Sequence, residues 1–201
     1  RVSGSENADD IAEGREQALA IVKGKSVEEL KQACREIVDN RMLQKSYADT
    51  IELASMHLAA GQQVWLVSAT PVQIGQALAE TLGFTGALGT VAEEEDGKFT
   101  GRLVGDILHG PGKKHAVAAL AALQQLDLSK CTAYSDSVND LPMLNMVGSP
   151  VAVNPDRALR KHAKAQGWAV RDYRSVRRVM RAAVVPAVLA AAGLWWWRRR
   201  R

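Results

Sequence analysis

The sequence has only two cysteines, Cys34 and Cys131, and they lie far apart in the chain. They match no metal-ligand spacing, so we expect reduced thiols of the kind found in a cytoplasmic protein. No signal-peptide pattern opens the sequence. The histidines share no metal-binding spacing either; they are His57, His109, His115 and His162. A metal site built from cysteine or histidine is therefore not expected.

Acidic residues are absent from residues 174–201, a segment that holds eight arginines. The rest of the chain has 18 Lys+Arg against 22 Asp+Glu, so the body is mildly acidic although the whole chain carries a net charge of +4. A nucleic-acid-binding domain needs a basic face on its folded body, so no nucleic-acid partner is expected. The length of 201 residues and the apolar content of 47% suit one domain with a sizeable core and a small cap or insertion.

The arginine-rich tail also contains an uncharged run of 16 residues, Ala182–Trp197, which ends in three tryptophans and is followed by four arginines. A helix of that length spans about 24 Å, slightly less than the ~30 Å hydrocarbon core of a bilayer. Clustered tryptophan with flanking arginine is typical of membrane-interface segments. We predict a membrane anchor, spanning or interfacial, on a cytoplasmic protein. A helix packed on the body and a disordered end are the alternatives.

The body alternates helical patterns with short apolar runs, which indicates an α/β fold with a parallel sheet. We expect helices at Ile11–Val22, Ser26–Asn40, Tyr47–Ala60, Pro71–Leu82 and Gly112–Gln125, after Asp140 and after Asn154–Asp156. We expect strands at Val64–Val67, Thr132–Ser135, Val151–Val153 and Trp168–Val170, and a hairpin within Val91–Leu103 that turns at Asp96–Gly97. The predicted domains are a partial helical cap (1–60), an α/β core (61–173) and the tail (174–201).

Two acidic residues follow the predicted strand Thr132–Ser135. Asp136 comes directly after it, and Asn139 and Asp140 follow shortly. In open α/β sheets the ligand site lies beyond the carboxyl ends of the strands. Carboxylates at such a position suit Mg²⁺, which takes oxygen ligands and keeps several waters. The alternative is a helix N-cap with an acidic first turn.

Two further segments could contribute to a phosphate site. Ser68-Ala69-Thr70 follows a predicted strand and leads into a helix, where hydroxyls and free amides would bind phosphate oxygens. Its alternative is a helix N-cap. Lys113 lies at the start of another predicted helix, where a cation opposes the helix dipole, and neutralising a phosphate is one reason for it. A solvated surface lysine is the alternative.

The order of these segments resembles the haloacid dehalogenase superfamily, specifically its phosphoserine-phosphatase-like subfamily. Val64–Ser68 is similar to the second motif of that family, Lys113 with Val117 and Leu120 to the third, and Tyr134–Asp140 to the fourth. The stretches Glu95–Gly101 and Val153–Asp156 are also similar to segments of the subfamily.

The resemblance implies a Rossmann-like parallel sheet flanked by helices, with a small helical cap, and a phosphoaspartyl mechanism. In it an aspartate attacks the phosphoryl group, and water then hydrolyses the aspartyl-phosphate. By motif matching, Ser68, with Ala69 and Thr70, would bind the phosphoryl oxygens, and Lys113 would neutralise charge. Asp136 would bind Mg²⁺ with support from Asn139 and Asp140. The implied substrate is a small phosphorylated molecule.

The first motif of the family, an apolar strand followed by Asp-x-Asp, has no match in the sequence. Asp9-Asp10 follows a polar stretch, and the cap-like helices begin near residue 10. We expect that the chain lacks an upstream segment with the nucleophile; the alternative is a protein that has lost it. The function expected is a Mg²⁺-dependent phosphomonoester hydrolase, with a noncatalytic, membrane-tethered phosphate-binding module as the alternative. The arginine that recognises serine in phosphoserine phosphatases has only a loose match, Arg15, so the substrate stays open.

Overall fold

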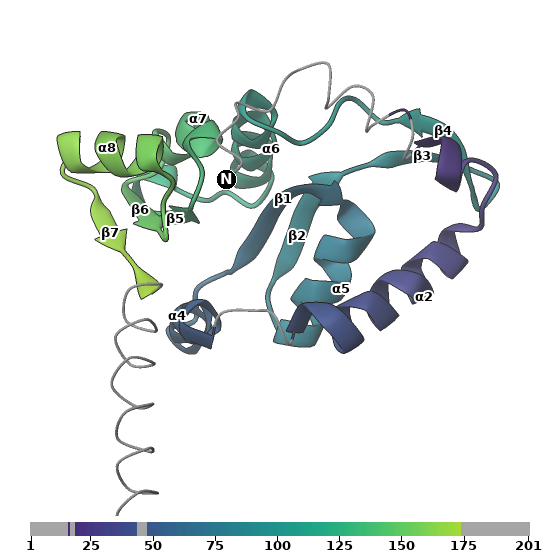
Figure 1. The fold of residues 1–201 in the computed structure, drawn as a ribbon, viewed down its shortest axis with the longest axis horizontal. Helices are drawn as coiled ribbons and strands as arrows, with labels where there is room; N and C mark the ends of the chain where they lie inside the picture. Colours follow the sequence, from purple (N-terminus) through teal and green to yellow (C-terminus); the bar gives the residue numbers. More distant parts are fainter. Residues whose placement is uncertain (1–15, 17–18, 44–47, 174–201) are drawn as a thin grey trace, which may run out of the picture. The chain divides into compact units, whose positions relative to one another are not determined.

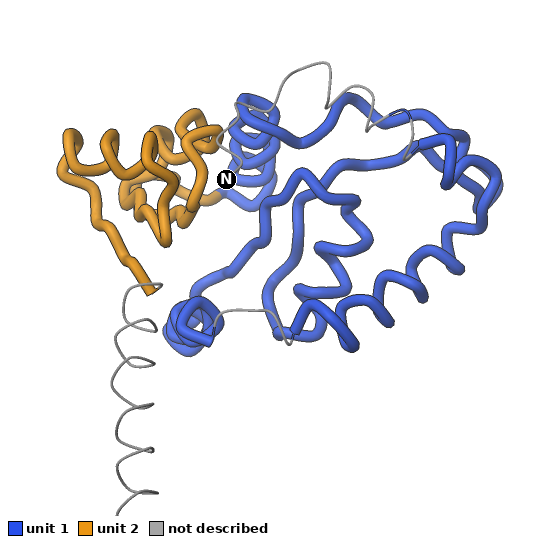
Figure 2. The backbone as a smooth tube through the Cα atoms, viewed as in Figure 1, with its two compact units in different colours: residues 1–125 blue, residues 126–201 orange. Residues whose placement is uncertain are grey.

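The computed structural model describes residue 16, residues 19–43 and residues 48–173 (Figure 1). The chain divides into two compact units, residues 1–125 and residues 126–201, which are coloured separately in Figure 2 and are described one at a time here. The predicted membrane anchor at Ala182–Trp197 and most of the predicted helix Ile11–Val22 lie outside the described residues. Within the described part of the chain, no helix is long and apolar enough to cross a bilayer.

The first unit combines parallel and antiparallel strands with α-helices. The helices are α2 (Val27–Ile37), which continues into a π-helical turn η1 (Val38–Met42), α4 (Ala48–Ala59), α5 (Val72–Leu82) and α6 (Pro111–Leu123). The strands are β1 (Trp65–Pro71), β2 (Gly86–Thr90), β3 (Ala92–Glu95) and β4 (Lys98–Leu103). Strands β1 and β2 pair in parallel, β3 and β4 form an antiparallel hairpin, and α5 packs on both β1–β2 and α2.

Local sequence signals explain where several of these elements begin and end. Ser26 accepts a hydrogen bond from the Glu29 amide at 3.4 Å and so caps α2, as the predicted capping box requires. The hairpin turns at Asp96 and Gly97, whose φ angles of 49° and 74° match the left-handed turn expected for Asp-Gly. Gly83, with φ 69°, ends α5.

The second unit is built on a parallel sheet with strand order β5–β6–β7. Its elements are a 3-10 turn η2 (Leu128–Lys130), β5 (Thr132–Ser135), a 3-10 turn η3 (Val138–Asp140), α7 (Leu141–Leu144), β6 (Ser149–Val153), α8 (Arg157–Ala165) and β7 (Ala169–Arg171). The core of the unit is the buried cluster Leu144, Ala152, Leu159 and Ala163. Strand β6 is central because it pairs with β5 on one side and β7 on the other, which places β5 at an edge of this sheet.

The α/β class and the parallel pairing agree with the sequence-based prediction, and β5 has the predicted bounds. Strand β2 was not predicted, and the end of β1 was predicted wrongly. Strand β1 extends to Pro71, so Ser68 lies inside the strand rather than after it, and Pro71 precedes α5 instead of lying in its first turn. The reason is that pairing with β2 resumes after an irregular stretch, with Pro71 opposite Thr90. The division into cap, core and tail stays a prediction.

Candidate functional site

Ser68 lies where the regular pairing of β1 with β2 is interrupted. The register holds from Trp65 to Val67 and shifts before Pro71. The Ser68 hydroxyl oxygen instead accepts hydrogen bonds from the Thr70 amide at 3.2 Å and from the Thr70 hydroxyl at 3.0 Å. A serine oxygen has two lone pairs, so these bonds leave the Ser68 hydroxyl hydrogen to donate. The half-buried Ser68 is thus arranged as a donor at the end of the regular strand.

The interrupted segment runs directly into the start of α5. Pro71 occupies the N-cap position and supplies no side-chain cap hydrogen bond. The first amides of a helix have no intrahelical acceptor, and together they favour an anion. Gly89 of β2 lies close to this turn, because a Cβ built on it would come within 2.6 Å of the Val72 Cα atom and 2.8 Å of the Thr70 carbonyl oxygen. The turn therefore has little room for side chains on its β2 side.

Thr90 connects this segment to the loop that leads to α6. Its hydroxyl donates to the Ala69 carbonyl at 2.7 Å and accepts from the Leu108 amide at 3.1 Å. The loop continues to Gly110, the N-cap residue of α6, and to the half-buried Lys113 in the first turn of that helix. Sequence reasoning missed Thr90. The signal was weak, since a lone threonine just before the predicted hairpin Val91–Leu103 does not reveal two non-local partners, and strand β2, which Thr90 ends, was not predicted.

Asp136 lies in the second unit, directly after β5, as predicted. Its side chain is exposed, whereas its backbone carbonyl accepts a hydrogen bond from the Asp156 amide at 2.8 Å. The backbone is thereby fixed while the carboxylate faces solvent. This is an arrangement in which a carboxylate can take a cation without first giving up a protein partner.

Asp140 has a different environment from Asp136, although both follow the same strand. It is only 6% exposed, and its Oδ2 atom accepts a hydrogen bond from the Ser135 hydroxyl at 2.7 Å. The Ser135 oxygen in turn accepts from the Ser137 amide at 3.1 Å. A buried carboxylate is costly unless hydrogen bonds or a cation compensate its charge. The hydrogen bond between Asp140 and Ser135 therefore stabilises the loop after β5. Asn139, which lies between Asp136 and Asp140 in the sequence, is exposed.

Asp156 ties this loop to the next strand–helix connection. One of its carboxylate oxygens accepts from the Val138 amide at 2.7 Å, and the other accepts from the Leu159 amide at 2.7 Å, which caps α8. Sequence reasoning recognised the stretch around Asp156 but did not assign it to the site. The sequence feature that could have indicated a role for Asp156 is its position directly after Asn154-Pro155, behind a strand.

The donor set of this loop fits a hard cation in type, since Asp136 and Asn139 present oxygen atoms and Asp140 lies beside them in sequence. These residues alone do not form a full set of metal ligands. The described residues contain no group of three or more His, Cys, Asp or Glu side chains that could hold a metal ion. Mg²⁺ is commonly held by one or two carboxylates and water, so a small donor set is compatible with it. Ser68, Thr70 and Lys113 belong to the first unit and the three metal candidates to the second.

Comparison with known proteins gave a family and a set of relatives. Residues 3–145 match the family model described as haloacid dehalogenase-like hydrolase. The chain is 54% identical over 187 residues to a Mycobacterium tuberculosis protein named phosphoserine phosphatase SerB1, covering 93% of this chain and 60% of that protein. A Streptomyces azureus protein named inhibition of morphological differentiation protein is 36% identical over 173 residues, covering 86% of this chain and 62% of that protein. The chain thus spans about 60% of the length of these relatives.

Solved structures resemble the chain as well. A Bordetella pertussis protein of unknown function superposes with a TM-score of 0.73 at 32% identity, covering 80% of this chain and 73% of that one. A phosphoserine phosphatase in its apo form superposes with a TM-score of 0.57 at 19% identity, covering 86% of this chain and 81% of that one. The second likeness concerns the fold alone.

Proposed function

Since the chain belongs to the haloacid dehalogenase-like hydrolase family, we propose that it carries the phosphate-binding and metal-binding parts of a phosphomonoester hydrolase. The relative named phosphoserine phosphatase supports a phosphatase of that type. The structural observation that carries the proposal is the free donor hydrogen of Ser68 beside the uncapped start of α5. Both features present hydrogen-bond donors, which is what phosphoryl oxygens require.

In the proposed reaction, Ser68 donates its hydroxyl hydrogen to a phosphoryl oxygen, and the amides at the start of α5 bind the same group. Ala69 and Thr70 shape this turn, and Thr90 holds it by accepting from one segment and donating to another. Lys113 neutralises the negative charge that accumulates on the phosphoryl group. Positioning and charge stabilisation of this kind supply most of the catalysis in phosphoryl transfer.

We propose Mg²⁺ as the cofactor, with Asp136 as its protein ligand and Asn139 and Asp140 in support. When bound, the ion would neutralise charge on the phosphoryl oxygens. The exposed carboxylate of Asp136 and the braced, buried carboxylate of Asp140 support this division of roles. Ser135 and Asp156 would keep the loop in position, because their hydrogen bonds fix Asp140 and the Val138 amide.

The nucleophilic aspartate is proposed to come from a strand upstream of the sequence given. The absence of an Asp-x-Asp motif and the greater length of the relatives support this. Among the described residues, β1 pairs only with β2, and β5 pairs only with β6, so each has an edge at which a further strand could form hydrogen bonds. The aspartyl carboxylate would attack phosphorus and expel the alcohol, and water would then release phosphate from the acyl phosphate.

The proposed substrate class is a small phosphorylated metabolite, of which phosphoserine is one candidate. The serine-recognising arginine has only the loose match Arg15 in the sequence, and that residue lies outside the described residues. Membrane attachment through Ala182–Trp197 also stays a proposal. It can be checked by fusing the tail to a soluble reporter and fractionating cells, where a fully soluble reporter would remove the idea.

The test is hydrolysis of p-nitrophenyl phosphate with and without Mg²⁺. It compares this chain with a version that carries the upstream sequence. The proposal expects activity in the longer version, dependence on Mg²⁺, and loss of activity in Asp136→Asn. A chain that binds phosphate esters but hydrolyses none in either form would instead support the noncatalytic binding module.

A further inference from the structure

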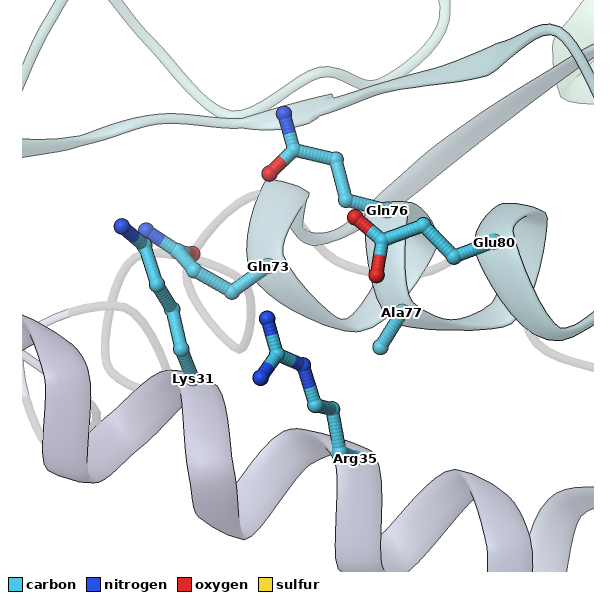
Figure 3. A pocket seen from close by; sticks show the side chains of 6 residues that line it. All are labelled: Lys31, Arg35, Gln73, Gln76, Ala77 and Glu80. Atoms are coloured by element: carbon cyan, nitrogen blue, oxygen red, sulfur yellow. The ribbon is translucent and has the colours of Figure 1, made fainter.

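Among the described residues, the buried polar or charged side chains are Gln73, Asp140 and Asn154. Gln73 lies beside a cavity of about 170 Å³ between α2 and α5 (Figure 3). Arg35 and Glu80, which line that cavity, are exposed, so their charges are solvated and do not indicate a ligand. Asp140 belongs to the loop after β5. Asn154 lies directly after β6, in the connection to α8, and the proposed reaction gives it no role.

Two hydrogen bonds hold Asn154 to the chain at the end of β7. Its backbone amide donates to the Arg171 carbonyl at 2.7 Å, and its side-chain oxygen accepts from the Tyr173 amide at 2.8 Å. Asn154 is only 9% exposed, and a polar side chain is costly to bury unless such bonds are made. The connection between β6 and α8 is thus attached to the end of β7.

The backbone of Asn154 has an uncommon conformation. Its φ angle is 47°, in the left-handed region, which asparagine adopts more readily than most residues. The next residue is Pro155, whose ring restricts the backbone of the residue before it and fixes its own φ at about −65°. Because both residues are restricted, the direction in which the chain reaches Asp156 depends on how Asn154 is held.

Asp156 forms the contact with the loop that carries Asp136. Its amide donates to the Asp136 carbonyl at 2.8 Å, and its carboxylate accepts from the Val138 amide at 2.7 Å. These bonds hold the backbone of the loop and leave the Asp136 carboxylate exposed. The position of that carboxylate therefore depends on Asp156 and, through it, on Asn154.

We propose that Asn154 is a positioning residue for the cation ligand Asp136. The contacts lead from the Tyr173 amide to Asn154, and from Asp156 to the backbone of Asp136, all within the second unit. Asn154 itself touches neither the cation nor the substrate. The inference rests on the proposed function, because it takes Asp136 as the Mg²⁺ ligand. Removal of a residue that orients a metal ligand commonly weakens metal binding by about 10- to 100-fold.

The competing explanation is that Asn154 serves only the turn between β6 and α8. In that case its replacement would lower the stability of the fold and leave the affinity for a cation unchanged. The two explanations therefore differ in metal affinity measured on folded protein.

The test is the affinity for Mn²⁺, which suits the same oxygen ligands as Mg²⁺ and is detected as the free ion by electron paramagnetic resonance. It uses the version that carries the upstream sequence. Asn154→Gly keeps a residue that tolerates a positive φ and removes the side-chain acceptor. We expect the dissociation constant for Mn²⁺ to rise by about tenfold. Asn145→Gly, the same change at an exposed asparagine that follows α7, is the matched control and should bind Mn²⁺ as the unchanged protein does.

Tyr173→Pro removes the donor at the other end of the same hydrogen bond, because proline has no amide hydrogen. It should weaken Mn²⁺ binding by a similar factor. The double variant with Asn154→Gly should bind no more weakly than either single variant, since both remove one bond. Tyr173→Ala keeps the amide and should bind Mn²⁺ more tightly than Tyr173→Pro.

Asp136→Asn is the reference for the proposed metal site and should weaken Mn²⁺ binding most. If it does so while Asn154→Gly and Tyr173→Pro bind as tightly as the unchanged protein, the positioning role is wrong and the proposed function stands. If Asp136→Asn has no effect, the metal site is wrongly assigned and the positioning role fails with it. Thermal unfolding without metal checks that each variant is folded at the temperature of the titration.

Discussion

At the scale of single residues, the ends of β1 and β5 are held by side-chain hydrogen bonds as well as by strand pairing. Thr90 holds the end of β1, and Asp156 holds the loop after β5, each by contacts with two segments of the chain. These residues contact backbone groups and leave Ser68 and Asp136 available to other partners. The structure therefore separates side chains that support the candidate site from side chains that would react or bind in it.

Asp156→Ala tests the support of the Asp136 loop. The substitution removes the acceptors of both the Val138 and Leu159 amides, one of which caps α8. We expect a loss of about 1–3 kcal/mol in the free energy of unfolding, measured by urea denaturation. Asp156→Asn keeps one acceptor oxygen and should lose about half as much, whereas equal effects of the two substitutions would contradict the two-bond arrangement.

Thr90→Val tests the support of the Ser68 segment at nearly constant volume. The valine can neither donate to the Ala69 carbonyl nor accept from the Leu108 amide. We expect a loss of about 1–2 kcal/mol in stability and faster hydrogen exchange of the Leu108 amide. Thr81→Val is a control for removal of a threonine hydroxyl within a helix, where the bond goes to the Ala77 carbonyl. Unchanged Leu108 exchange in Thr90→Val would show that the bond is not formed.

At the scale of elements, the turn between β1 and α5 is confined by its neighbour β2. Gly89→Ala would push a methyl group toward the Val72 Cα atom and the Thr70 carbonyl oxygen, so we expect a loss of about 1–3 kcal/mol in stability. It should also weaken binding of inorganic phosphate, because the Ser68–Val72 turn is displaced. Calorimetry and urea denaturation measure the two effects.

Gly112→Ala is the matched control for that substitution. A Cβ at this position of α6 meets the Ile107 carbonyl oxygen at 3.4 Å, an ordinary contact, and alanine favours a helix over glycine. We expect stability to be unchanged or slightly higher. A Gly89→Ala variant as stable as Gly112→Ala would contradict the close approach of β2 to the turn.

Element types were predictable wherever a local signal dominated. The capping box at Ser26, the Asp96–Gly97 turn and the apolar run Thr132–Ser135 each depend on neighbouring residues, and each element formed as predicted. The extension of β1 to Pro71 was not predictable, because it results from renewed pairing with Thr90, a residue distant in sequence. For the same reason, the roles of Thr90 and Asp156 emerged only from their partners in the fold.

At the scale of the whole molecule, the phosphate candidates belong to one compact unit and the metal candidates to another. The sequence predicted that Asp136 follows a strand end, and β5 confirms that position. The cooperation of Asp136 with Ser68 and Lys113 rests on the family resemblance and stays a proposal. Chain length matters here as well, because the chain covers 60% of the relative named phosphoserine phosphatase SerB1, and the nucleophile is proposed to lie upstream of the sequence given.

The most direct measurement of the central claim is the rate of p-nitrophenyl phosphate hydrolysis by the version that carries the upstream sequence, with Asp136 intact or changed to Asn. The account predicts Mg²⁺-dependent hydrolysis that falls by at least 100-fold in Asp136→Asn, because the exposed carboxylate is the proposed metal ligand. Asp96→Asn, which alters an acid in the hairpin turn where asparagine also fits, should keep full activity. Hydrolysis that is equally fast in Asp136→Asn, or that does not depend on Mg²⁺, would contradict the account.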